Sequence, residues 1–312
     1  MPPRTAEYKM AKIKSGRELI ISLGLWLLPI LDRFMMWSAA TKEYQVFPNE
    51  VFSWTTYLAE NWTTIRDEAQ ALMCDPMSIP SLREISIDHE KIAVDDRWRS
   101  FFLWGYGIRS DVNCARCPET AQVLERIPGL LTAMYSVMLP GAHVPRHTGP
   151  TKAIVTAHMG LIVPRERQKC RMAIGDHEVV WREGQIAIFD DMFPHEVWNE
   201  TEDHRVILML HLKRPLRFPG SLVRDALFAL LRASPFVRDG VRNIERWDET
   251  RTAAVDRRYE RSSGDLQPQA PRPVIATNPF AGAGNERAAA NTVTATNAAD
   301  FLSDVKRSRP AR

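Results

Sequence analysis

The sequence has few of the features that mark several protein classes. Only four of its 312 residues are cysteine, too few for a disulfide-stapled scaffold of this length, which favours a reducing compartment. Forty-one Lys and Arg against 38 Asp and Glu leave a net charge of only +3, so we expect no nucleic-acid partner. No repeat of about 20 to 50 residues recurs, which excludes solenoids and propellers. The 45% hydrophobic and 25% charged residues are typical of a globular protein.

Long hydrophobic runs are also missing. The longest extends over 13 residues from Leu19 to Leu31 and contains Pro29, whereas a membrane-spanning helix needs about 20 apolar residues. Lys12, Lys14 and Arg17 precede it, as in a signal peptide, but no convincing cleavage site follows at once. We interpret residues 1–45 as an apolar, membrane-proximal segment. The sequence leaves open whether residues 19–37 span a membrane, lie on it or avoid it.

The cysteines give little sign of a metal site. Cys114 and Cys117 form a CxxC motif, but a zinc site needs a second pair, and Cys74 and Cys170 stand alone. We therefore favour two loop cysteines before Pro118 over a zinc or redox centre.

Hydrophobic spacing predicts helices before residue 133 and strands after it. Residues 54–73 have helical spacing, and 120–131 read as a short helix with Thr120 as N-cap and Gly129 near its end. Short runs rich in Val, Ile, Met and aromatic residues then follow, separated by turn residues, at 135–139, 154–163, 170–174, 178–181, 185–189, 196–198 and 205–212. Many short strands at close spacing indicate an antiparallel sandwich or barrel, such as a double-sheet jelly roll.

The C-terminal part divides into two segments. Residues 216–250 combine an apolar stripe with interspersed arginines, which predicts a basic amphipathic helix. This helix either lies on an anionic membrane surface or packs on the domain with a solvated basic rim. Residues 251–312 are rich in Ala, Asn, Thr, Pro and Gly and poor in aromatic residues, so we expect a disordered tail.

Seven of the eight histidines fall between residues 143 and 211, and two of them stand out. His147 lies at a strand-to-turn corner, and His195 follows Asp190 and Asp191 after a strand. Arg205 begins an apolar strand ten residues later. Two imidazoles from distant strands on one face of a barrel, with a guanidinium farther inside, are what an iron(II) and 2-oxoglutarate site requires. His143, His177 and His204 are most simply surface residues.

Residues 98–215 carry a series of motifs in a recognisable order. These are Trp98 with Phe102-Leu103-Trp104, Tyr135-Ser136, Leu139-Pro140-Gly141, His147-Thr148-Gly149-Pro150-Thr151, His158-Met159-Gly160-Leu161, Trp181-Arg182-Glu183-Gly184, Phe189-Asp190-Asp191, His195-Glu196-Val197-Trp198 and Arg205. The series resembles the aspartyl/asparaginyl β-hydroxylase family of Fe(II)/2-oxoglutarate-dependent dioxygenases. The resemblance implies a mainly β dioxygenase domain with flanking helices over 46–215, built on a double-stranded β-helix of the cupin-like, jelly-roll type.

The resemblance also implies an iron site. His147 and His195 would bind Fe(II), and Gly149 stands where most related oxygenases place a carboxylate ligand. Water or another oxygen ligand would then occupy the vacant position. Halogenases also lack this carboxylate and bind chloride there, so halogenation is a minor alternative.

The same resemblance assigns the cosubstrates, 2-oxoglutarate and O2. Arg205 would bind the distal carboxylate of 2-oxoglutarate with help from Ser136, and His158 would contact the cosubstrate rather than the metal. Trp98 matches a family position near the active site. We expect Asp190 and Asp191 to orient the turn before His195 or to support that histidine, not to ligate iron. Because these groups are present, an inactive binding module is disfavoured.

The substrate is either a lipid or a peptide. Thr156 replaces an arginine that is common in members acting on aspartyl or asparaginyl residues, although Lys152, Arg146 or Arg171 would be other sources of charge. The family includes bacterial hydroxylases of lipid acyl chains, among them lipid A hydroxylases of the inner membrane. With the apolar segment at 19–31 and the basic helix, we favour a membrane-lipid acyl chain over a peptide. The expected location is the cytoplasmic side of the inner membrane, or the cytoplasm.

Overall fold

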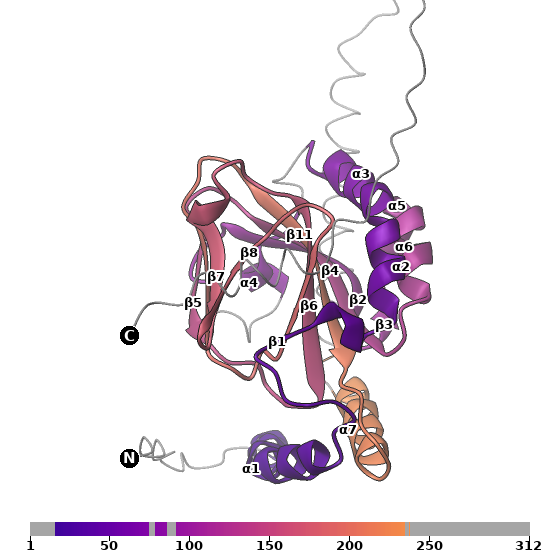
Figure 1. Ribbon diagram of the computed structural model, residues 1–312. Helices are drawn as coiled ribbons and strands as arrows, with labels where there is room; N and C mark the ends of the chain where they lie inside the picture. Colours follow the sequence, from indigo (N-terminus) through magenta and orange to yellow (C-terminus); the bar gives the residue numbers. More distant parts are fainter. Residues whose placement is uncertain (1–15, 75–78, 86–91, 235–236, 238–312) are drawn as a thin grey trace, which may run out of the picture.

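Two antiparallel β-sheets face each other at the centre of the molecule (Figure 1). The computed structural model describes residues 16–74, 79–85, 92–234 and 237. The larger sheet has the order β1 (Val46–Phe47), β9 (Ile186–Phe189), β6 (Ile154–Ile162), β11 (Arg205–Lys213), β4 (Leu130–Met138), β2 (Trp98–Gly105) and β3 (Ile108–Arg109). The smaller sheet has the order β5 (His143–His147), β10 (His195–Asn199), β7 (Cys170–Ile174) and β8 (His177–Val180).

The strand order is that of a jelly roll. From β4 to β9 the chain alternates between the larger and the smaller sheet, with β7 and β8 as a hairpin in the smaller one. Strand β10 then inserts between β5 and β7, and β11 inserts between β4 and β6. This pattern confirms the predicted double-stranded β-helix. It brings residues far apart in sequence, such as His147 and His195, onto neighbouring strands.

Alternation along the strands separates two cores. In β11, Val206, Leu208 and Leu210 face outward into a core shared with the helices, whereas Ile207 faces the space between the sheets. The outer core lies under α2 (Trp54–Glu60), α3 (Trp62–Leu72), α5 (Asp111–Arg116) and α6 (Pro118–Glu125), which cover this face of the larger sheet (Figure 1). A polar side chain on the inner face is therefore enclosed inside the barrel. Short helical turns η1 (Asn49–Val51), α4 (Leu82–Ile85) and η4 (Arg167–Lys169) complete the described elements around the sheets.

Two helix predictions were wrong in detail. The helix expected over 54–73 is broken at Asn61, whose side-chain amide donates to the carbonyl of Tyr57 in competition with the regular backbone pattern. The helix expected over 120–131 is α6, which begins at Pro118 with Cys117 as N-cap and ends at Glu125. Leu130 already belongs to β4, because Gly129 turns the chain with a positive φ.

Only one of the two CxxC cysteines lies outside a helix. Cys114 is in α5 and Cys117 joins α5 to α6, and both are buried in the outer core. Burial raises the pKa of Cys114 to about 11 and that of Cys117 to about 12. Both side chains are therefore neutral thiols at physiological pH, which is the form that packs in a core rather than the form that binds metal.

Helices α1 (Gly16–Trp37) and α7 (Gly220–Ala233) lie together at one end of the barrel (Figure 1). Met35 of α1 and Phe228 of α7 share a small buried core with the first residues of β4 and β6. Among the described residues, no helix has the length and apolar character needed to cross a bilayer. Arg238, Arg242 and Arg246 of the expected basic helix, and the tail at 251–312, lie outside the described residues.

Candidate active site inside the barrel

Two histidines face each other at the edge of the smaller sheet. His147 ends β5, His195 begins β10, and they are direct partners across this antiparallel pair, with ring centroids 4.1 Å apart. Each Nδ1 contacts a backbone carbonyl two residues earlier: His147 that of Pro145 at 2.8 Å, and His195 that of Phe193 at 3.0 Å. A carbonyl only accepts hydrogen bonds, so each Nδ1 carries the proton and each Nε2 carries a lone pair. This is the arrangement in which a histidine binds metal through Nε2.

Burial also keeps both rings neutral. It lowers the pKa of His147, and burial together with the neighbouring His147 lowers the pKa of His195 to about 4. A neutral imidazole is the form that ligates a metal ion, so no proton has to be displaced at physiological pH.

A buried carboxylate occupies the space beside Gly149. A Cβ atom added to Gly149 would overlap the side chain of Asp191, and the Gly149 amide donates to the Asp191 carbonyl at 2.7 Å. Thr156 donates to Oδ2 of Asp191 at 3.0 Å, whereas Oδ1 is buried without a hydrogen-bond partner among the described residues. Burial raises the pKa of Asp191 to about 7. Asp191 thus leaves no room for a side chain at residue 149.

Arg205 lies farther inside the barrel and is buried. Its Nη2 donates to Oγ of Ser136 at 3.2 Å, and Trp98 Nε1 donates to the same oxygen at 3.0 Å. The guanidinium lies 4.7 Å from the centroid of the Trp181 ring. Burial lowers the pKa of Arg205 to about 10, so it remains a cation at neutral pH. No carboxylate of the described residues forms an ion pair with it, so this is a buried positive charge without a counter-charge.

His158 lies between the histidine pair and the arginine. Its ring packs edge-on against Phe189 at 4.8 Å, and Phe189 in turn lies 5.9 Å from the ring of His195. On the other side, Trp181 lies 6.0 Å away. Both ring nitrogens of His158 are buried without a hydrogen-bond partner in the described part of the chain, and burial lowers its pKa well below 6.5. His158 is therefore neutral, with one N–H free to donate to a ligand.

Sequence reasoning missed two polar groups of this interior. Ser100 pairs with Ser136 across β2 and β4, so both side chains lie on the same face, and the Ser100 hydroxyl is buried without a partner among the described residues. The indole N–H of Trp181 is in the same situation. The available signal for Ser100 was a small polar residue in a strand that otherwise consists mostly of large apolar residues.

The unpartnered groups around Arg205 share one property. Arg205 Nε, one nitrogen of His158, the Ser100 hydroxyl and the Trp181 N–H are all buried donors. Buried donors in folded proteins nearly always have a partner, so a group of them indicates a bound acceptor. Around a cationic guanidinium, that acceptor is an anion such as a carboxylate.

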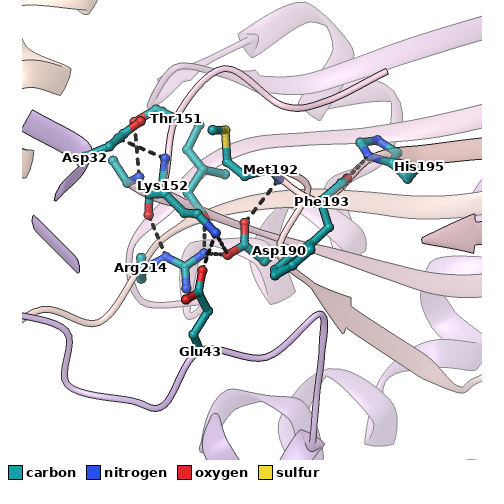
Figure 2. A network of polar contacts seen from close by, with 11 residues as sticks. Asp32, Glu43, Thr151, Lys152, Asp190, Met192, Phe193, His195 and Arg214 are labelled. Carbon is teal, nitrogen blue, oxygen red and sulfur yellow. Dashed lines mark hydrogen bonds and ion pairs between the residues drawn. The ribbon is translucent and has the colours of Figure 1, made fainter. Parts of the chain in front are cut away.

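A network of charges holds the turn that leads to His195 (Figure 2). The carboxylate of Asp190 is fully buried, and it accepts from Arg214 at 2.7 Å, from Lys152 at 2.8 Å and from the amide of Met192 at 3.1 Å. Asp190 therefore orients the turn before His195, as expected, and does not face the histidine pair.

Two of the three basic residues considered for a peptide substrate are engaged elsewhere. Lys152 pairs with Asp190 and Glu43. Arg171 pairs with Glu200 and stacks on Trp198. Arg146 is exposed beside His147.

Comparison with known proteins identifies the family. The profile described as Aspartyl/Asparaginyl beta-hydroxylase matches residues 59–215. The chain belongs to the aspartyl/asparaginyl β-hydroxylase family. It is therefore a hydroxylase of the 2-oxoglutarate dioxygenase class, and family membership implies iron and 2-oxoglutarate as cofactors.

Relatives of this β-hydroxylase family member include a bacterial and a human protein. The ornithine lipid ester-linked acyl 2-hydroxylase of Rhizobium tropici is 36% identical over 204 residues, which cover 65% of this chain and 73% of the relative. The human aspartyl/asparaginyl beta-hydroxylase is 34% identical over 165 residues, which cover 51% of this chain but only 21% of the human protein.

Proposed function

We propose that this protein is an Fe(II)/2-oxoglutarate-dependent dioxygenase that hydroxylates an acyl chain of a membrane lipid. His147 and His195 hold the iron, and Arg205 with Ser136 holds the distal carboxylate of 2-oxoglutarate. The observation that carries the proposal is the uncompensated guanidinium of Arg205 in the same enclosed space as two neutral histidines whose Nε2 lone pairs are available.

The residues of the barrel divide the work. When bound, iron, 2-oxoglutarate and O2 supply the oxidation that converts a C–H bond to C–OH, while 2-oxoglutarate becomes succinate and CO2. Arg205 and Ser136 orient the cosubstrate, and the indole of Trp98 fixes the Ser136 hydroxyl that takes part. His158 donates a hydrogen bond to the cosubstrate. Apolar side chains such as Phe189 and Ile207 keep water out of the interior.

A lipid substrate is supported better than a peptide. The relative that this chain covers over most of its length is named for an acyl chain of ornithine lipid. Thr156 stands where an arginine is common in the peptide-modifying members. Its hydroxyl donates a hydrogen bond to Asp191, and it contributes no positive charge. Lys152 and Arg171 are paired with carboxylates. The alternative, hydroxylation of an aspartyl or asparaginyl side chain, would have only Arg146 beside the site.

Halogenation is supported less well. A halide would have to bind beside Gly149, where the carboxylate of Asp191 lies. A carboxylate there repels chloride whenever it is ionised.

We place the enzyme at the cytoplasmic side of the inner membrane. Its four cysteines are all free thiols, as expected in a reducing compartment. An acyl-chain substrate would require contact with the membrane surface.

Mass spectrometry of lipid extracts tests the proposal. Cells that express the wild-type protein should contain lipid species heavier by one oxygen atom, and cells that express His147→Ala should lack them. His177→Ala, which alters a histidine on β8 that β7 separates from His195, is the matched control and should retain the product. Identical lipids in all three, with purified protein consuming 2-oxoglutarate on Asp-containing peptides, would establish the peptide alternative instead.

A further inference from the structure

The outer face of α1 is apolar. Leu27, Ile30, Phe34 and Trp37 recur at helical spacing on one side of the helix and are exposed, Trp37 to 76%. The opposite side carries Met35, which is buried against the barrel. Large hydrophobic side chains of this kind are rarely left in water as a contiguous group.

Helix α7 is apolar on two sides. Val223, Leu227, Phe228 and Leu231 face the barrel and α1. Leu222 and Leu230 lie on the outward side with Ala226 and Ala229, and Phe218 precedes the helix, 79% exposed. Packing on the barrel accounts for only one of these apolar sides, so the outward face of α7 needs a second apolar environment.

The two helices are joined to each other through the backbone beside them. Residues 38–40, which follow α1, run beside residues 215–217, which precede α7: Ala40 donates to the Pro215 carbonyl at 3.0 Å and Arg217 to the Ser38 carbonyl at 2.7 Å. Gly220 lets the start of α7 approach the end of α1 closely, because a Cβ at this position would overlap the side chain of Ser38. We call the outward apolar side chains of these segments (Leu27, Ile30, Phe34, Trp37, Phe218, Leu222 and Leu230) the apolar platform.

The platform lies at the end of the barrel that carries the histidine pair. Asp32, on the inward side of α1, accepts hydrogen bonds from the Thr151 hydroxyl at 2.6 Å and from the Lys152 amide at 3.0 Å. Thr151 and Lys152 belong to the segment that begins at His147. The ammonium group of Lys152 in turn donates to the carboxylate of Asp190, in the turn before His195 (Figure 2).

The charges around the platform are mainly positive. Three basic residues lie beside the platform: Arg33 in α1, Lys42 after α1, and Arg217 directly before Phe218. All three are exposed, and none forms an ion pair with another described residue. The acidic residues nearby are neutralised, since Glu43 pairs with Lys152 and Asp225 with Lys213 and Arg224. An apolar surface with a cationic rim complements an anionic bilayer.

We propose that the apolar platform inserts into the surface of an anionic membrane and that α1 and α7 dock the enzyme there without crossing the bilayer. The inference deepens the proposed function, because it places the histidine end of the barrel toward the membrane that holds the lipid substrate. Trp37 supplies an aromatic side chain of the kind favoured at the interface between headgroups and acyl chains, and Phe218 adds to the inserted apolar face.

Sedimentation of the full chain with vesicles tests the docking. The probe is vesicles of phosphatidylglycerol and phosphatidylcholine, compared with phosphatidylcholine alone. The triple variant Trp37→Ser, Leu222→Ser, Leu230→Ser should bind mixed vesicles about tenfold or more weakly, because three large apolar side chains no longer insert. Arg33→Glu with Arg217→Glu should lose the preference for anionic vesicles and most of the salt dependence.

Control variants use apolar residues that are exposed elsewhere on the molecule. Val94→Ser and Val112→Ser remove exposed side chains away from the platform and should leave vesicle binding unchanged. Equal binding by the triple variant and these controls would overturn the proposal. So would light scattering that shows a wild-type dimer turned into a monomer by the triple variant, because the platform would then be covered by a second copy.

A separate assay distinguishes docking from catalysis. Lipid dispersed in detergent needs no bilayer, so the triple variant should hydroxylate it at the wild-type rate while hydroxylating lipid in vesicles poorly. Vesicle binding by the wild type without hydroxylation of any lipid would refute the proposed substrate class and leave the docking intact.

Discussion

At the scale of single residues, Arg205 has an environment that stability alone does not explain. Its cationic side chain is buried with hydrogen bonds to Ser136 and no opposing charge among the described residues. A buried unpaired charge is unfavourable for folding, so its presence points to a function that needs it.

Arg205→Met should therefore separate stability from activity. We expect the ligand-free variant to be at least as thermostable as the wild type, because the substitution replaces a buried charge by an apolar chain of similar length. Turnover of 2-oxoglutarate should fall at least about a hundredfold, as expected when a buried charge-assisted contact worth several kcal/mol is removed. Differential scanning fluorimetry should also show that added 2-oxoglutarate no longer raises the melting temperature. A stabilising response to 2-oxoglutarate equal to that of the wild type would refute the assignment.

Gly149 and Asp191 should be energetically coupled. Gly149→Ala introduces a Cβ where the Asp191 carboxylate lies, so we expect a destabilisation of about 1 to 3 kcal/mol from overpacking. In the double variant Gly149→Ala, Asp191→Ala the clash is absent. Urea unfolding of the wild type and the three variants measures the loss of unfolding free energy in each. The loss in the double variant should be smaller than the sum of the losses in the two single variants. Simple additivity would contradict the contact.

These two sites show what the sequence alone could provide. His147, His195, Arg205 and Ser136 were predicted because they lie in motifs that resemble the family, and the jelly roll then brings them into one interior. The contact of Asp191 with Gly149 could not be predicted, because it depends on how the turn after β9 packs against the corner after β5. Local patterns carry no information about such a contact between distant segments.

At the scale of elements, predictions were best where an apolar run is bounded by turn residues and worst where a side chain redirects the backbone. The strands at 154–162, 170–174 and 205–213 lie close to their expected bounds. The helix expected over 54–73 is split because the side chain of Asn61 bonds to the backbone, which apolar spacing does not reveal. The edge strand β5 was expected only as a strand-to-turn corner at His147, without bounds, because Pro145 and His147 interrupt its hydrophobic pattern.

Helix α1 depends on one buried carboxylate for its attachment. Asp32→Ala would leave the Thr151 hydroxyl and the Lys152 amide without their acceptor, which should cost about 1 to 3 kcal/mol. Asp32→Asn keeps an acceptor oxygen. Burial raises the pKa of Asp32, so its ionised form is disfavoured in the folded protein, and its contribution to stability declines as the pH rises. An asparagine cannot ionise, so the Asn variant avoids the free-energy cost of burying a charged carboxylate.

Chemical unfolding near neutral pH and at lower pH should therefore rank the Asn variant level with or above the wild type, with the Ala variant below both. The wild type should approach the Asn variant as the pH falls toward the pKa of an ordinary carboxyl group. Equal stability of the Ala and Asn variants would show that the hydrogen bonds of Asp32 do not anchor α1.

At the scale of the whole molecule, the smaller sheet has a weak edge where the proposed iron site lies. Among the described strands, β5 has only one partner, β10, and the two histidines lie opposite each other in that pair. A metal held by both would join an edge strand to its neighbour.

Removal of iron should therefore lower the stability of the folded protein. Ligand bound at about a hundred times its dissociation constant stabilises a protein by about 2.7 kcal/mol, which corresponds to roughly 5 to 10 °C in melting temperature for a domain of this size. Treatment with a chelator should lower the melting temperature by this amount, and anaerobic addition of Fe(II) should restore it. The His147→Ala protein should respond to neither treatment; a full response would place the metal elsewhere.

The paired backbone segments at 38–40 and 215–217 have a geometric consequence for the chemistry. They hold α1 and α7 at a constant height below the barrel, so a protein docked through these helices would carry its histidine pair at one fixed distance from the membrane surface. That distance would set the position of the oxidised carbon relative to the lipid headgroup. The far end of the acyl chain would stay in the bilayer and have no influence on this position, so chains of different length would be hydroxylated at the same carbon counted from the headgroup.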